Sequence, residues 1–189
     1  MSTFVALLRG VNVGAANRVA MPALRDALTE AGFAGVRTHL QSGNIVLSTR
    51  LAEREVSETV ALVIGERCGL RVPVVVRTGE ELARVVAENP FPEAAELAPK
   101  RYQVTFFSAP LGDAVAARLR ALAGGPFASD TEAVSLARSN RNAYGWHPDG
   151  IHSSKLAREL SDHRLGVTAT ARNWTTVLSL LGLAAGDDS

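Results

Sequence analysis

The chain has 189 residues, 47% of them apolar, enough for one good core or two small cores that share an interface. Its net charge of +1 excludes the strongly positive footprint of a duplex nucleic-acid binder. Its apolar runs are far shorter than the roughly 20 residues that cross a bilayer, and we see no export signal, so we expect no membrane segment. The single cysteine, Cys68, cannot form an intramolecular disulfide and is expected to be a small buried hydrophobe, which favours the cytoplasm.

Charge is distributed unevenly along the chain. Residues 1–50 carry five Arg against two acidic groups, whereas residues 51–100 carry six basic against nine acidic groups. The positive end includes a polar loop that follows the first apolar run. An anionic partner would therefore be recognised locally and not by the field of the whole protein.

The first half alternates strand-like and helix-like patterns. Residues 4–8 form a continuous apolar run typical of a central strand, and Met21, Leu24 and Leu28 have the spacing of a helix. Thr78 and Glu81 have the spacing of a capping box, which predicts a helix start. In order we expect a strand at 4–8, a helix at 21–31, strands at 36–41 and 45–47 with a turn between them, a helix at 56–67 that ends at Gly69, a strand at 72–76 and a helix from 78 to 89.

Proline punctuates residues 90–100, which we interpret as a linker. The order of elements then recurs. The second half is predicted to contain strand 102–107, helix 113–123, strands 132–137 and 143–146, helix 154–160, strand 167–170 and helix 173–183.

Each half therefore follows the order β-α-β-β-α-β-α. We predict an α+β protein with two ferredoxin-like subdomains, each βαββαβ plus an extra helix, that arose by duplication. The subdomains would be residues 1–89 and 101–184, joined by the linker 90–100. One continuous mixed sheet covered by helices is permitted by the same order of elements.

Residues 9–18, the opening loop, join the first strand to the first helix. Such a loop can direct successive backbone N–H groups at an anion. Glycine and asparagine tolerate the positive φ that this needs, and two arginines could grip a phosphate or carboxylate. Its candidate ligand-binding residues are Arg9, Gly10, Asn12, Gly14, Asn17 and Arg18. The loop matches no established phosphate-binding signature, and a long turn that only holds itself together explains the same residues equally well.

Two further segments complete the predicted ligand-binding set. Gln41, Ser42 and Asn44 lie at a polar hairpin tip, where ordinary turn chemistry is the competing explanation. Arg172, Asn173 and Trp174 lie at a second strand-to-helix junction that mirrors the opening loop. There a helix cap at Asn173 and a core position for Trp174 are the structural alternatives.

Catalytic machinery is hard to assemble from this sequence. The histidines at 39, 147, 152 and 163 lack metal-ligand spacing, so we expect no metal and no cofactor. No nucleophile motif marks a catalytic residue, and whether the protein is an enzyme stays open. Ser153, Ser154 and Lys155 open a predicted helix, where a hydroxyl cap is expected. Tyr144 and Trp146 could stack on RNA bases, but packing explains them equally well, and a sequence-specific nucleic-acid reader is disfavoured.

Several motifs resemble the bacterial domain-of-unknown-function family numbered 1697. The motifs are LLRGVNVG with Asn17 and Met21, GFAGVRTHLQSGNIVL, the SSKL that begins at Ser153, and LGVTATARNWTTVLSLLGL. The resemblance implies a two-part α+β organisation and supplies no activity, ligand or catalytic residue.

Two departures from the family pattern bear on function. Family members usually have a Gly-rich turn and a Lys where this chain has Ala15, Ala16 and Arg18, and an aromatic-Gly segment where it has residues 149–152. Because Arg does not deprotonate, the substitution at position 18 favours charge recognition over catalysis by a lysine.

The leading hypothesis is a soluble binding module for a small anionic ligand, such as a nucleotide or phosphorylated metabolite, held at the opening loop. The alternatives are a metal-independent enzyme of unassigned chemistry and a protein-interaction scaffold with no small-molecule site. A second copy of the chain is a candidate partner in a homodimer.

Overall fold

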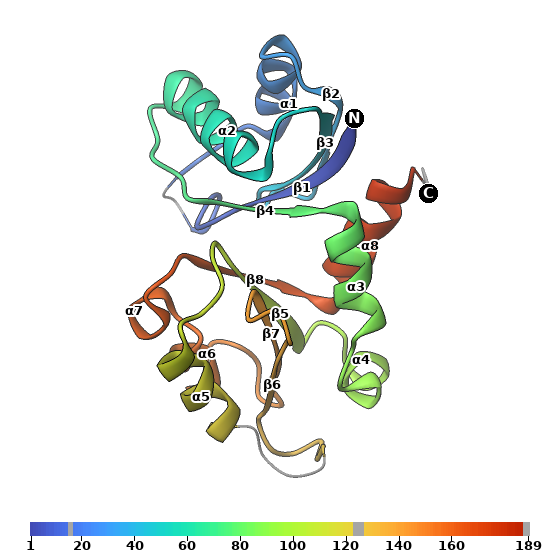
Figure 1. The fold of residues 1–189 in the computed structure, drawn as a ribbon, viewed down its shortest axis with the longest axis vertical. Helices are drawn as coiled ribbons and strands as arrows, with labels where there is room; N and C mark the ends of the chain where they lie inside the picture. The colour runs from blue at the N-terminus through green and yellow to red at the C-terminus, as the bar shows by residue number, and fades with distance from the viewer. Residues whose placement is uncertain (15–16, 123–126, 187–189) are drawn as a thin grey trace. The chain divides into compact units, whose positions relative to one another are not determined.

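The computed structural model describes residues 1–14, 17–122 and 127–186 (Figure 1). It divides into two compact units, the first made of Met1–Arg84 with Ser179–Ser189 and the second of Val85–Leu178. The division falls inside two helices, α3 (Gly79–Ala87) and α8 (Trp174–Ala185). The last turns of α8 therefore belong to the first unit, which is discontinuous in sequence.

The first unit contains a four-stranded antiparallel sheet with the strand order β2-β3-β1-β4. Its elements are β1 (Ser2–Leu8), α1 (Met21–Glu30), β2 (Ala34–His39), β3 (Asn44–Thr49), α2 (Glu53–Cys68) and β4 (Val74–Thr78). Helices α1 and α2 lie on one face of the sheet (Figure 1). Because side chains alternate along a strand, Phe4, Ala6 and Leu8 pack into the core beneath these helices. Half-buried Cys68 packs against the same core.

The second unit contains a sheet of the same kind, with the order β6-β7-β5-β8. Its elements are α4 (Pro92–Leu97), β5 (Tyr102–Phe107), α5 (Asp113–Leu122), β6 (Ala133–Leu136), β7 (Asn142–Trp146), α6 (Lys155–Glu159), α7 (Asp162–Leu165) and β8 (Ala169–Asn173). Phe107, Leu119 and Ala143 lie in a core formed between the sheet and its helices.

The predicted α+β fold with two similar ferredoxin-like subdomains is confirmed. In both sheets the first strand of the half is central, and the last strand pairs with it at an edge. Strands β1 to β4 and β5 to β8 form two separate sheets, so one continuous mixed sheet is excluded. The subdomain boundaries at 89 and 101 stay a prediction, because compact units do not establish where independently folding parts begin.

The two halves also correspond at the end of the last strand. Arg77 on β4 pairs with Val5, and Arg172 on β8 pairs with Val104, so the two arginines occupy equivalent positions. The next residue caps a helix in each half. The Thr78 hydroxyl accepts from the backbone N–H of Glu81 at 3.0 Å, which confirms the predicted capping box, and Asn173 Oδ1 accepts from the N–H of Thr176 at 2.9 Å.

Two short helices were not predicted, and one predicted strand end was wrong. Helix α4 lies within the predicted linker, because proline is compatible with the first turn of a helix, where its missing N–H has no intrahelical partner. The single-turn helix α7, closed by Gly166 at φ 71°, was not predicted. Strand β8 extends through Arg172 and Asn173, which had been placed beyond the strand. The predicted helix end at Ala123 and the alanines at 15 and 16 lie outside the described residues.

Candidate functional site

The opening loop and the hairpin tip, residues 41–44, lie against each other in the first unit. The Asn12 side-chain amide joins them, since its Nδ2 donates to the carbonyl oxygen of Gln41 at 2.7 Å and to that of Val19 at 2.9 Å. Its Oδ1 accepts from the N–H of Val19 at 2.9 Å. Both donor hydrogens of this amide are therefore used, and Asn12 supports the loop from within.

The backbone of the hairpin tip at Gly43 packs directly against the side chains of Leu8 and Val11. A Cβ at Gly43 would lie 2.5 Å from Val11 Cγ2 and 2.6 Å from Leu8 Cβ, so no larger residue fits without displacing its neighbours. The φ of Gly43, 73°, is in the left-handed region that favours glycine. The Leu8 N–H donates to the Gly43 carbonyl at 2.8 Å, which ties the tip to the end of β1.

The described residues of the opening loop include several with left-handed backbone, and the Asn12 N–H donates to the Asn17 carbonyl at 3.0 Å. Gly10, Asn12, Gly14 and Asn17 all have positive φ, between 51° and 69°. The N–H groups of Gly10 and Gly14 donate no hydrogen bond to any other described residue. Arg9 and Arg18 are exposed. Asn17 Nδ2 donates to the Gly10 carbonyl at 3.1 Å and closes the loop on itself.

The tip residues predicted to bind a ligand differ in accessibility. Asn44 is fully buried, and its Nδ2 donates to the His39 carbonyl and to Ser42 Oγ, each at 3.0 Å. Gln41 and Ser42 are exposed. The tip therefore presents Gln41 and Ser42 to solvent, while Asn44 shapes the turn beneath them.

The C-terminal members of the predicted set belong to the second unit and are built into it. Arg172 is only 8% exposed, and burial lowers its pKa to about 10. Its Nη1 donates to Thr170 Oγ1 at 2.7 Å and to the Ala171 carbonyl at 2.9 Å. Asn173 caps α8, and Trp174 is buried with its ring centroid 5.2 Å from that of Tyr102.

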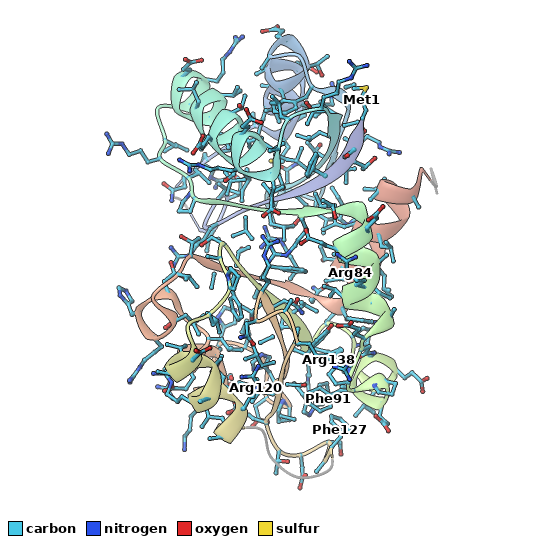
Figure 2. All side chains as sticks on the ribbon, in the orientation of Figure 1. Met1, Arg84, Phe91, Arg120, Phe127 and Arg138 are labelled. Atoms are coloured by element: carbon cyan, nitrogen blue, oxygen red, sulfur yellow. The ribbon has the colours of Figure 1, made fainter. Side chains whose placement is uncertain are left out.

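An aromatic cluster fills one side of the second unit. Phe91 and Phe127, labelled in Figure 2, have ring centroids 5.9 Å apart, and Phe127 also contacts Trp146. The Tyr144 hydroxyl donates to the Val85 carbonyl at 2.9 Å, and burial raises the Tyr144 pKa to about 12. Because Tyr144 and Trp146 are each only 2% exposed, they pack in the core and present no face for stacking on RNA bases.

Sequence reasoning missed a polar cluster at the start of α6. His147 Nδ1 lies 2.7 Å from Ser154 Oγ, which also accepts from the N–H of Ala157. The Glu132 carboxylate, from a distant part of the chain, accepts from the N–H of Leu156 at 3.0 Å. Burial lowers the His147 pKa, although the charge of Glu132 opposes this shift. Since Ser154 is buried and accepts the N–H of Ala157, it caps α6, and the structure selects it from the serines expected to supply a hydroxyl cap.

Three cavities lie elsewhere. One of about 500 Å³ lies where Thr3, Gly79 and Ala184 meet in the first unit, and another of about 500 Å³ beside β6 is rimmed by Lys155 and Glu159. A groove of about 640 Å³ follows α2 near Gly65. The opening loop lines none of these three. In the part of the chain that the structure describes, no three His, Cys, Asp or Glu side chains could hold a metal ion, and no helix is long and apolar enough to span a membrane.

Comparison with known proteins places the chain in a family. The model of the family described as "Protein of unknown function (DUF1697)" matches residues 1–137, more than half of the chain. The chain belongs to this family. The matched residues include the opening loop and the hairpin tip but end before Ser154 and the C-terminal strand-to-helix junction.

The fold of the DUF1697 protein is also found in a solved structure. The conserved bacterial protein SP0830 from Streptococcus pneumoniae matches with a TM-score of 0.69 and 21% sequence identity, over 97% of this chain and 98% of that chain. At this identity the likeness shows the fold alone. No curated protein matches the chain.

Proposed function

We propose that this DUF1697 protein is a binding module for a small anionic ligand, such as a nucleotide or phosphorylated metabolite, and that the opening loop is its binding surface. The observation that carries the proposal is a supported loop in which two backbone N–H groups bond to no other described residue. Asn12 fixes the loop against the hairpin tip, while the N–H groups of Gly10 and Gly14 donate to no other described residue. Backbone N–H groups beside residues of positive φ can bind an anion where they converge.

The positive charge of the opening loop also favours binding of an anion there. Arg9 and Arg18 are exposed in a loop that contains no acidic residue. One guanidinium group can donate two parallel hydrogen bonds to the oxygens of a phosphate or carboxylate. Two arginines could therefore fix the orientation of an anion that the backbone N–H groups also bind. Gln41 and Ser42, at the adjacent tip, are exposed polar groups that could contact the rest of a ligand.

The proposed contact set is narrower than the set predicted from sequence. Asn12 and Asn44 support the site, since their Nδ2 groups donate within the protein. Arg172, Asn173 and Trp174 are left out, because each has a structural role in the second unit. We also propose a cytoplasmic location, on the ground that the single Cys68 forms no disulfide.

The test is a calorimetric and thermal-shift titration with nucleotides and sugar phosphates. A ligand that binds the wild type should raise its melting temperature in proportion to its affinity. The Arg9→Ala, Arg18→Ala variant should bind roughly tenfold more weakly or worse, because two charge-assisted contacts are lost. The Arg50→Ala, Arg71→Ala variant removes equal charge from exposed positions elsewhere in the first unit and should bind like the wild type.

Two results would refute the site. The first is equal weakening by both double variants, which would mean a nonspecific effect of net charge. The second is the absence of any ligand that shifts the wild type more than it shifts the Arg9→Ala, Arg18→Ala variant.

A further inference from the structure

Leu40 has a left-handed backbone conformation that is unusual for a leucine. Its φ is 58°, and the other described non-glycine residues with positive φ are Asn12, Asn17 and Asn140. Asparagine tolerates this conformation because its short polar side chain can hydrogen-bond locally. A branched aliphatic side chain has no such compensation, and a bulky residue there is an outlier.

Packing does not compensate for the strain at Leu40. The residue is 60% exposed at the turn between β2 and β3, where Gly or Asn would satisfy the backbone better. A strained conformation at an exposed side chain is a ground for proposing a functional contact.

A second apolar side chain lies on the adjacent segment. Val13 is 71% exposed in the opening loop. The hydrogen bond between Asn12 Nδ2 and the Gln41 carbonyl joins the residue that precedes Val13 to the residue that follows Leu40. The exposed side chains of Val13 and Leu40 therefore each adjoin a residue of this hydrogen bond. The same loop carries the exposed Arg9 and Arg18.

We propose that the ligand is an organic phosphate with an apolar portion, and that Leu40 and Val13 contact that portion while the opening loop holds the phosphate. This rests on the proposed anion site and adds the chemical class of its ligand. The apolar part would bury side-chain surface that the free protein exposes to water, which is favourable in proportion to the area covered.

The test compares inorganic phosphate, butyl phosphate and octyl phosphate by calorimetry, with the ester kept below its micelle concentration. Wild-type affinity should rise with chain length by up to about fourfold for each methylene in contact. Leu40→Asn should keep its affinity for inorganic phosphate, lose most of the gain with chain length, and melt no lower than the wild type because Asn tolerates the backbone. Leu62→Asn, which changes another 60% exposed leucine of the first unit, should retain the gain.

The outcomes separate this inference from the function on which it rests. Phosphate binding without any gain from octyl phosphate would overturn the inference and leave the anion site standing. A gain that persists in Leu40→Asn would also overturn it, since the chain would then lie elsewhere. If neither phosphate nor any ester binds, both proposals fail.

The source of the phosphate is settled by a second arm with vesicles. Sedimentation with vesicles of phosphatidylcholine, with and without phosphatidic acid, is compared between the wild type and Leu40→Asn. Leu40-dependent binding that requires phosphatidic acid identifies a lipid headgroup. Leu40-dependent binding of octyl phosphate alone identifies a free amphiphile.

Discussion

Gly43 occupies the point where the hairpin tip meets the opening loop. We expect Gly43→Ala to destabilise the protein by roughly 2 to 4 kcal/mol, because the new methyl would overlap Val11 and Leu8 and the residue would keep a left-handed φ. Urea denaturation measures this loss. Gly10→Ala is the matched control, since its φ is 69° but a Cβ there meets nothing within 4 Å. The control should lose only about 1 kcal/mol. Equal losses in the two variants would contradict the close approach at Gly43.

Single residues in this loop show where sequence reasoning stops. The glycines and asparagines of the opening loop tolerate positive φ, and Gly10, Asn12, Gly14 and Asn17 adopt it. The same composition could not tell which asparagine faces a ligand and which holds the chain. That depends on acceptors at Val19 and Gln41, and Gln41, 29 positions away, is a neighbour only through the tertiary fold.

At the scale of elements, we expect His147, in the cap of α6, to make the free energy of unfolding depend on pH. Burial lowers the pKa of His147 below its ordinary value of 6.5, so the unfolded chain binds more protons than the folded one between the lowered pKa and 6.5. The free energy of unfolding should therefore rise with pH through this window and fall on acidification. Denaturant titrations at several pH values measure the slope, which for one proton is at most about 1.4 kcal/mol per pH unit.

The variants for this test are chosen from the same region. His147→Asn keeps a polar atom near Ser154 without a titrating group, and it should flatten the slope. His152→Asn removes an exposed histidine nearby and serves as the control. A slope unchanged in His147→Asn would show that this histidine does not govern the cap.

Helices and strands were predicted well where local signals are strong. The capping box at Thr78 and the glycine stop after α2 depend on neighbours within a few residues, and both are present. Helix α4 was missed because the same prolines suit a linker or a first helical turn, and local sequence does not separate the two. The Glu132 contact to α6 crosses 24 positions and leaves no periodic trace.

At the scale of the whole molecule, the first unit needs the end of the chain. Arg37 Nη2 on β2 donates to the carbonyl of Leu183, and a Cβ at Gly79 would meet that of Ala184 at 3.7 Å. Truncation after Leu178 should therefore destabilise the first unit, by roughly 1 to 3 kcal/mol for the lost acceptor alone. Amide hydrogen exchange of the truncated and full chains measures the effect.

The location of the loss is the decisive part of that measurement. Protection in β2 and β3 should fall more than protection in β6 and β7. An even loss across both sheets would contradict the discontinuous first unit. An unchanged first unit would instead favour the predicted subdomain of residues 1–89.

The sequence by itself determined the fold class, the repeated order of elements and most element positions, because hydrophobic periodicity and capping are local properties that recur in each half. It also located the opening loop and the hairpin tip as polar segments of interest. Only the tertiary structure decided that these two segments lie together, that Arg172 and Trp174 are built into a core, and that the end of α8 belongs with the first unit. Those facts depend on contacts between distant residues, and no local pattern in the chain encodes such contacts.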